Sequence, residues 1–103
     1  MKKIVIFGSG DHAKVVLTEI LNFKKFKVAG FVDDKKKVGE TLFKYLGKEY
    51  KNIDSLKSFA KKTKDQTISG IIGIGSNYLR KKIFNKVNKI NKFFDWETIV
   101  SKN

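Results

Sequence analysis

Apolar residues occur along this chain in short uninterrupted runs that alternate with segments of helical periodicity. The first run, at residues 4–7, lies between lysines and glycines, and a run without polar members predicts a strand buried on both faces of a sheet. In residues 11–21 the apolar positions recur every three or four residues, which predicts an amphipathic helix. Residues 27–32 contain valines and a phenylalanine and favour a second strand. This β-α-β order requires parallel strands joined by a right-handed crossover.

The middle of the chain is less regular. Residues 35–52 mix lysines and glycines with short apolar pieces, so we predict a loop there with room for one short strand. A helix is expected to run to about Thr63, capped by Asp54 or Ser55. Residues 68–74 read as an apolar strand whose glycines permit close packing.

The C-terminal part is predicted to form a long helix over residues 78–91 and a last extended segment over residues 93–100. The side chains expected on the buried face of that helix are Leu79, Ile83, Val87 and Ile90. The aromatic residues that follow it, Phe93, Phe94 and Trp96, are expected to pack in the core rather than to stack on a base. Together the elements predict one α/β domain over residues 1–103, a shortened Rossmann-like three-layer domain with a mostly parallel sheet of four to five strands.

The composition restricts the chemistry of this domain. The chain contains no cysteine, which excludes disulfides and thiolate sites and favours a cytoplasmic location. No apolar stretch is long enough for a signal peptide or a membrane span. The net charge of +13 favours anionic partners such as phosphorylated ligands, nucleic acid or an anionic membrane surface. However, only one of the 23 basic residues is an arginine, and scattered lysines are typical of a solvated surface, so we consider nucleic acid an unlikely partner.

The first candidate site follows the first predicted strand, where the chain reads Gly8, Ser9, Gly10, Asp11 and His12. Glycines allow a tight turn and let a phosphate approach the backbone, while the following helix offers free N–H groups and a partial positive charge. A glycine pattern alone is weak evidence, but this one has a strand before it and a helix after it. We therefore favour nucleotide binding over a glycine turn without a ligand.

Acidic residues follow the second predicted strand. Asp33 and Asp34 stand where dinucleotide-binding folds hydrogen-bond ribose hydroxyls, although aspartates before a lysine run also form ordinary turns. His12 is the only histidine, and we expect it to donate a hydrogen bond to a phosphate or sugar oxygen. Because it has no partnered nucleophile and no cluster of metal-ligand type around it, we predict no catalytic residue and no metal site.

A second candidate loop lies before the long C-terminal helix. Gly75 and Asn77 precede or begin that helix, and Arg80 lies near its start. Open α/β sheets bind ligands in loops at the carboxyl ends of their strands, so this loop is expected to face the first glycine turn. Asn77 either caps the helix or contacts a base or sugar. Arg80 either reaches a phosphate or lies in solvent.

Three blocks of the sequence together resemble the N-terminal domain of the NeuD/PglD family of bacterial sugar O- and N-acyltransferases. The blocks are MKKIVIFGSGDHAKVV at residues 1–16, GFVDD at residues 30–34 and IGIGSNYLRKKIF at residues 72–84. In that family the N-terminal domain resembles a shortened Rossmann fold that holds the UDP part of a UDP-amino-sugar. A left-handed β-helix of hexapeptide repeats follows it, binds acetyl-CoA and carries the catalytic histidine. The resemblance therefore implies a role in cell-surface glycan biosynthesis.

The resemblance also implies which residues form the substrate site. The nucleotide-sugar cradle falls on Gly8, Gly10, Asp11 and His12, with Asp33 and Asp34 at the nucleoside and Gly75, Asn77 and Arg80 on the opposite side. Asp11 departs from the family, which commonly has a second glycine at this position. Its carboxylate either crowds the phosphates or accepts from a sugar hydroxyl.

No hexapeptide repeat is present in these 103 residues. Residues 96–103 resemble the family's entry into its first hexapeptide coil, and residues 93–103 lead toward that domain, so we expect the left-handed β-helix domain to be absent. Acetyl-CoA is then a co-substrate of the parent enzyme, and this domain is expected to bind no cofactor. The chain would be an excised domain, or a split gene product that works with a separate hexapeptide-repeat domain. The parent is expected to be a trimer and this chain a monomer or weakly associated.

The leading hypothesis is thus the UDP-sugar-binding domain of a bacterial sugar acetyltransferase, without transferase activity of its own. A stand-alone NAD(P)-type binding or regulatory domain is disfavoured because the chain offers no second substrate domain. The third hypothesis is a basic nucleic-acid-binding module. Stabilisation by UDP-sugars, stabilisation by NADH, or steeply salt-dependent nucleic-acid binding distinguishes the three.

Overall fold

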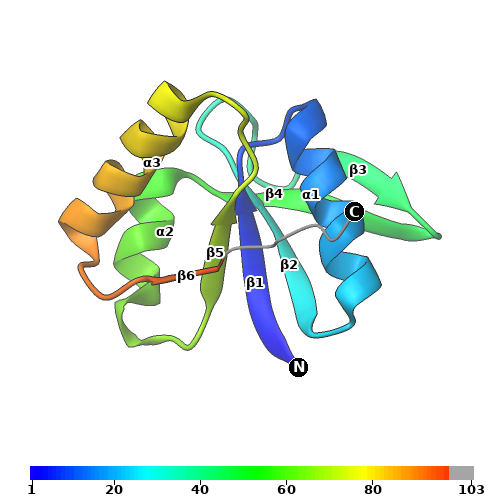
Figure 1. Ribbon diagram of the computed structural model, residues 1–103, viewed down its shortest axis with the longest axis horizontal. Coiled ribbons are helices and arrows are strands. Elements are labelled where there is room, and N and C mark those ends of the chain that lie inside the picture. The colour runs from blue at the N-terminus through cyan, green and yellow to red at the C-terminus, as the bar shows by residue number, and fades with distance from the viewer. Residues whose placement is uncertain (98–103) are drawn as a thin grey trace.

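The computed structural model describes residues 1–97 and shows a six-stranded sheet with helices on both faces (Figure 1). The elements in chain order are β1 (Lys2–Phe7), α1 (Asp11–Phe23), β2 (Phe26–Val32), β3 (Thr41–Tyr45), β4 (Lys48–Asp54), α2 (Leu56–Lys62), the 3-10 turn η1 (Thr63–Asp65), β5 (Ser69–Ile72), α3 (Asn77–Ile90) and β6 (Asp95–Trp96). The strand order is β3-β4-β2-β1-β5-β6. All neighbouring strands are parallel except β3 and β4. The expected three-layer architecture with a mostly parallel sheet is confirmed.

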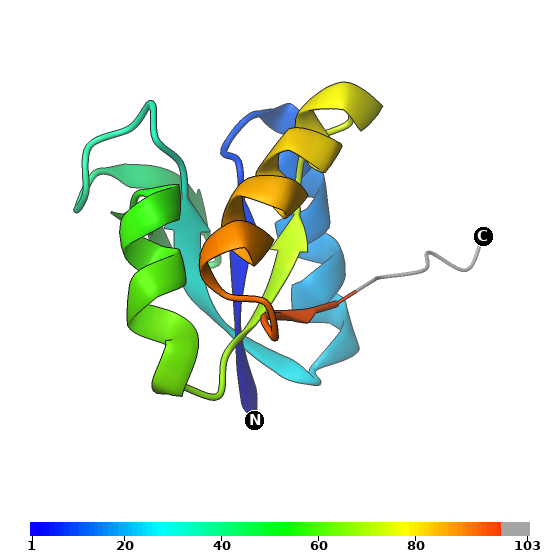
Figure 2. The same cartoon turned by 90° about the vertical axis from the view of Figure 1, so that its left-hand side faces the viewer.

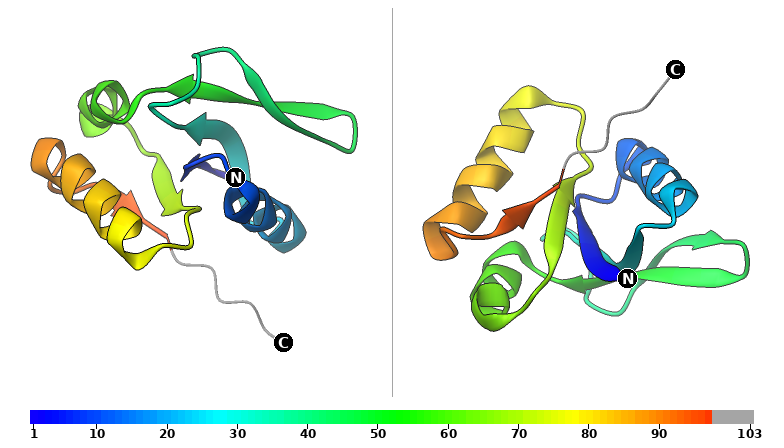
Figure 3. Two further views of the ribbon diagram at one scale, coloured as in Figure 1. Left: turned by 90° about the horizontal axis from the view of Figure 1, so that it is seen from above. Right: turned by 60° about the horizontal axis from the view of Figure 1, so that its bottom comes forward.

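The sheet separates two apolar cores, and β1 contributes to both. Because alternate residues of a strand point to opposite faces, Ile4 and Ile6 pack with α1, whereas Val5 and Phe7 pack with α2 and α3. All four side chains are fully buried, so the prediction of a strand covered on both faces is confirmed. Figure 3 shows the three layers from above, with α1 on one side of the sheet and α2 and α3 on the other. Figure 2 shows α2 and α3 side by side.

Residues 35–52 fold differently from the prediction. Instead of a loop with one short strand, the chain forms the antiparallel hairpin β3–β4, which brings the sheet to six strands rather than four to five. Leu46 and Gly47 make its turn, both with positive φ, 52° and 80°, as tight hairpin turns require. Leucine rarely adopts such a φ, so the turn had no clear sequence signal. The hairpin is stabilised by the parallel pairing of β4 with β2, which no local pattern reports.

Other elements differ mainly at their ends. The strand predicted over residues 68–74 is limited to β5, and the extended segment predicted over residues 93–100 is limited to β6. Residues 98–100 lie outside the described residues. No helix within residues 1–97 is both long enough and apolar enough to cross a membrane.

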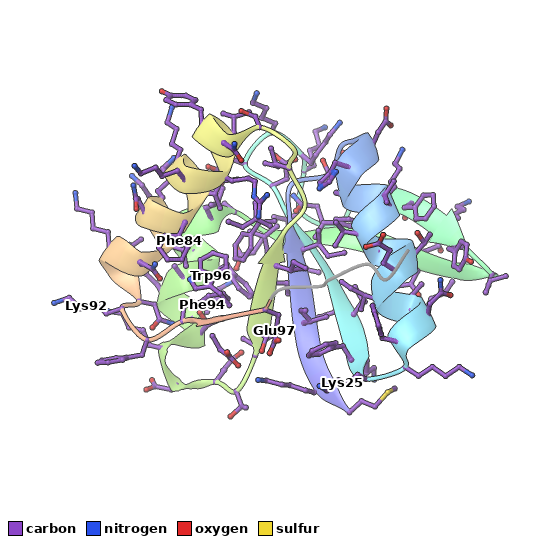
Figure 4. All side chains as sticks on the ribbon, viewed as in Figure 1. Lys25, Phe84, Lys92, Phe94, Trp96 and Glu97 are labelled. Carbon is purple, nitrogen blue, oxygen red and sulfur yellow. The ribbon has the colours of Figure 1, made fainter. Side chains whose placement is uncertain are left out.

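An aromatic cluster fills the core beneath α3 (Figure 4). Phe94 lies 5.8 Å from Phe7 and 4.8 Å from Trp96, measured between ring centroids. The indole N–H of Trp96 donates to the Asn88 Oδ1 at 3.0 Å. The packing role predicted for Phe94 and Trp96 is confirmed, but that of Phe93 is wrong, because its side chain is 94% exposed.

Candidate functional site

Strands β1 and β5 lie side by side, and the connections that follow them diverge. The segment after β1 enters α1 on one face of the sheet, and the segment after β5 leads to α3 on the other face (Figure 3). In an open α/β sheet, ligands bind at the carboxyl ends of strands whose connections diverge in this way. The two glycine loops predicted as site elements therefore meet at one edge of the sheet.

Gly8 shapes the turn after β1. Its φ of 98° is left-handed, and a Cβ at this position would lie 2.6 Å from the Ile74 Cγ1, in the loop after β5. Its N–H donates to the Val32 carbonyl at 3.0 Å. Only glycine satisfies both the backbone and the space. Gly10 differs, because a Cβ there would meet nothing within 4 Å, and it stands at the N-cap of α1 without a side-chain cap. The first N–H groups of α1 thus remain available to a ligand.

Ser9 and Asp33 are brought together by the pairing of β1 with β2. The Ser9 hydroxyl donates to the Asp33 Oδ2 at 2.6 Å, and the Lys35 N–H donates to the Asp33 Oδ1 at 2.9 Å. Asp33 is half-buried. The glycine turn and the acidic position, predicted separately, therefore form one constellation with the carboxylate beside the turn.

Asp34 has a different role. Its Oδ1 accepts from the Leu56 N–H at 2.8 Å, at the start of α2, and its Oδ2 lies 3.8 Å from the Lys86 ammonium. The N-cap position expected for Ser55 is confirmed, but the side chain of Ser55 makes no capping hydrogen bond. A carboxylate distant in sequence caps the helix instead, which favours the turn and capping reading of Asp34 over a ligand contact.

Asp54 is instead tied to its own helix. Burial acts to raise the pKa of this carboxyl, but hydrogen bonds from Ser58, from Lys62 and from the Ser55 N–H outweigh burial and lower the pKa below its ordinary value. The Lys62 ammonium lies 3.1 Å from the Asp54 Oδ2. This carboxylate is structural.

A cavity of about 530 Å³ lies between the glycine turn, the loop after β2 and one side of α3. Its apolar walls come from Val32, Leu56, Ile74, Leu79 and Ile83, and its basic groups are Lys35, Lys82 and Lys86. Leu79 was expected in the core but is 44% exposed, because it lines this cavity. The volume suits a small-molecule ligand, and the lysines suit an anionic one.

The α3 residues of this cavity were not predicted as site residues. Leu79, Lys82, Ile83 and Lys86 recur at intervals of three and four, which places them on one side of a helix. That spacing was a usable signal. The same spacing also predicts a core face with solvated lysines beside it.

A second cavity, of about 350 Å³, lies between α1 and α3 along β5, and it contains His12 and Arg80. Because β6 pairs only with Ser69 and Gly70, the later residues of β5 stay unpaired by that strand and Ile71 and Ile72 line the cavity. Phe84, Trp96 and Glu97, labelled in Figure 4, also line this cavity. The structure thus separates His12 and Arg80 from the first cavity.

Three predicted residues line neither cavity. Asp11, Gly75 and Asn77 are exposed. Asn77 is the first residue of α3, but the cap is Ser76, whose Oγ accepts from the Leu79 N–H at 3.4 Å. The capping role considered for Asn77 is therefore wrong. Within residues 1–97 no group of three or more His, Asp or Glu side chains is arranged to hold a metal ion.

Comparisons with known proteins found a matching family model and similar solved structures. A family model described as the PglD N-terminal domain matches residues 3–87. The acetyltransferase domain of PglB from Neisseria gonorrhoeae FA1090, solved with acetyl coenzyme A, is 18% identical with a TM-score of 0.67, and the match covers 90% of this chain and 40% of that one. A search of curated protein sequences gave no match.

Two further solved structures come from Caulobacter crescentus and contain CoA and GDP-perosamine. PerB is 27% identical with a TM-score of 0.64, covering 88% of this chain and 39% of that one. A mutant of perosamine N-acetyltransferase is 27% identical with a TM-score of 0.63, covering 88% and 40%. The present chain thus spans about 40% of the length of these proteins.

Proposed function

The chain belongs to the PglD N-terminal domain family, and we propose that it binds the nucleoside diphosphate part of a nucleotide-activated amino sugar at the carboxyl edge of its sheet. The observation that carries the proposal is the cavity of about 530 Å³ where the glycine turn, Asp33 and the α3 lysines converge. The GDP-perosamine bound in PerB, at 27% identity to this chain, supports a nucleotide sugar as the ligand class.

The diphosphate lies against the turn from Gly8 to Gly10. Free N–H groups and the partial positive charge at the start of α1 attract phosphate oxygens. Lys82 and Lys86 line the opposite wall and add point charges that attract the diphosphate. The open space around Gly10 leaves room for a phosphate at the backbone.

The nucleoside lies toward the loop after β2. The Asp33 carboxylate accepts two hydrogen bonds from the protein and retains capacity for ribose hydroxyls, since a carboxylate has about four acceptor positions. The apolar walls, with Leu56 and Leu79 among them, offer a surface for the base. The sugar passes the glycine turn and reaches the second cavity, where His12 and Arg80 hydrogen-bond its polar groups.

In the whole family protein, an acetyl group from acetyl-CoA is transferred to the amine or hydroxyl of the bound sugar. The PglB domain was solved with acetyl coenzyme A and PerB with CoA, which supports this co-substrate. The role of the present residues is to bind and orient the acceptor. The UDP sugar expected from the sequence stays a prediction, with a GDP sugar as the competing ligand.

Thermal stability in the presence of ligands tests the proposal. UDP- or GDP-linked amino sugars at a hundred times their Kd should stabilise the folded chain by about 2.7 kcal/mol, while NADH should not. Asp33→Ala should abolish the stabilisation. Lys82→Ala should weaken it, whereas Lys48→Ala, in the β3–β4 hairpin, should not and serves as the matched control for charge. Stabilisation by NADH alone, or by none of these ligands at millimolar concentration, would contradict the proposed function.

A further inference from the structure

A buried asparagine lies directly behind the loop that carries Asp33. Asn52, in β4, has no exposed surface. Its side-chain Oδ1 accepts from the Asp33 N–H at 3.0 Å, and its Nδ2 donates to the carbonyl oxygens of Asp33 at 3.0 Å and of Lys36 at 2.8 Å. From these bonds we infer that Asn52 is a positioning residue, which holds the Asp33 carboxylate ready for the ribose hydroxyls of the nucleotide. The inference rests on the proposed function.

The side chain of Asn52 takes the place of backbone hydrogen bonds that a neighbouring strand would make to Asp33. β2 pairs with β4 at Phe31 with Asn52 and at Val32 with Asp54, so the register shifts between the two pairs, as at a β-bulge. Beyond Val32 the side-chain amide of Asn52 bonds both the N–H and the carbonyl of Asp33. A residue of a neighbouring antiparallel strand would make the same pair of bonds. The backbone of Asp33 is therefore fixed although β2 has ended.

The backbone of Asn52 also binds this loop. Its N–H donates to the Glu40 carbonyl at 2.9 Å, and its carbonyl accepts from the Gly39 N–H at 2.8 Å. The loop between β2 and β3, at the upper left of Figure 2, is thus tied to one buried residue at both its beginning and its end. A buried polar group without a hydrogen-bond partner raises the free energy of the folded state. The loop is therefore restricted to the one arrangement that pairs these groups.

The arrangement matters for Asp33 because its side chain is held at the same time. The Ser9 hydroxyl and the Lys35 N–H occupy one position on each carboxylate oxygen. With the backbone held by Asn52, the remaining acceptor positions point in a set direction, so that ribose hydroxyls bind without prior reordering of the loop. Loss of Asn52 frees the backbone of Asp33 and Lys36. Ligand binding must then order this loop, and the free energy spent on ordering it weakens the affinity.

The test compares nucleotides with and without ribose hydroxyls on the full chain. Dissociation constants for GDP and UDP, and for their 2′,3′-dideoxy forms, are measured by calorimetry. Wild type should prefer the ribose form by about tenfold or more, the range expected for hydrogen bonds to a charged group. Asn52→Ala should lose most of this preference, while the Kd of the dideoxy form changes by less than about twofold.

Asn91→Ala is the matched control. Asn91 is also a buried asparagine, and its Oδ1 accepts from the Phe93 N–H at 3.3 Å in the loop after α3. This variant should unfold at lower urea concentration and keep the wild-type preference for ribose. If Asn52→Ala does not fold, Asn52→Ser, whose hydroxyl leaves one hydrogen-bonding group in place of the amide, should show the same loss of preference to a smaller degree.

The outcomes separate this inference from the proposed function. An unchanged ribose preference in the Asn52 variants, or an equal loss of affinity for ribose and dideoxy forms, overturns the positioning role. Wild-type binding without any ribose preference also overturns it and leaves nucleotide binding intact. Failure of the wild-type chain to bind either nucleotide refutes the proposed function itself, before any variant is considered.

Discussion

Replacing Gly73 with alanine tests the close packing of α1 against the loop after β5. The added Cβ would lie 2.8 Å from the Ala13 Cα, 2.8 Å from the Ile6 Cγ2 and 3.0 Å from the Ala13 Cβ. The φ of Gly73 is not positive, so an alanine there meets a packing problem and no backbone strain. Two of these contacts are with the first turn of α1, whose backbone cannot rotate away as a side chain can.

The size of the effect follows from these distances. Non-bonded carbons prefer a separation of about 3.5–4.0 Å, so α1 must move outward by more than about half an ångström. Such overpacking costs about 1–3 kcal/mol, and the lower chain entropy of alanine in the unfolded state offsets about 0.4–1 kcal/mol of it. From the middle of these two ranges, the expected net loss of unfolding free energy is about 1.3 kcal/mol, which lowers the urea midpoint by roughly 1 M.

Urea denaturation followed by Trp96 fluorescence measures this loss. Gly75→Ala, two residues further on, is the control, because its Cβ would meet nothing within 4 Å and its stability should stay within about 0.5 kcal/mol of wild type. Equal midpoints for Gly73→Ala and Gly75→Ala would refute the proposed contact between α1 and this loop. Because α1 begins at the glycine turn, Gly73→Ala should also weaken nucleotide binding.

Further predictions concern single hydrogen bonds and one titration. Asp34→Ala removes the acceptor for the Leu56 N–H and should cost about 1 kcal/mol in urea unfolding; unchanged stability would exclude the cap. The pKa of Asp54 is lowered from 3.8, so its stabilisation is present above that pH and lost as pH falls below it. Between about pH 6 and pH 3, the urea midpoint of Asp54→Asn should therefore fall less than that of wild type. Equal falls in midpoint would contradict a stabilising role of the ionised Asp54 carboxylate. Trp96→Phe removes the 3.0 Å bond to Asn88 and should cost about 1 kcal/mol by calorimetry, a value that Asn88→Ala should reproduce if the bond is the cause.

The elements surrounding the glycine turn were predictable because their signals are local. The apolar run in β1 and the three-and-four spacing in α1 each reflect a burial pattern that repeats within a single element. The β-α-β order then restricts the connection to a parallel pair. These features gave the three-layer fold, the glycine turn at Gly8 and the acidic position at Asp33 without knowledge of any distant contact.

The β3–β4 hairpin was missed because its stability is not local. Its strands are short and rich in lysine, and its turn places Leu46 at a positive φ. An isolated hairpin of this kind is marginally stable at best. The strands persist because β4 pairs with β2 and because Phe43 and Tyr45 pack against the core beside α1. Neither contact has a signature in residues 35–52.

The sequence by itself determined two features of the candidate site, a glycine turn after β1 and an acid after the second strand. Only the tertiary structure decided what each group contacts. In the folded chain Ser9 hydrogen-bonds Asp33, and Asp34 accepts a hydrogen bond from the start of α2. His12 and Arg80 lie in a second cavity. The tertiary structure also placed Asn52 behind Asp33. Periodicity reports which residues are buried, whereas strand register decides which distant side chains meet, and register depends on contacts across the whole sheet.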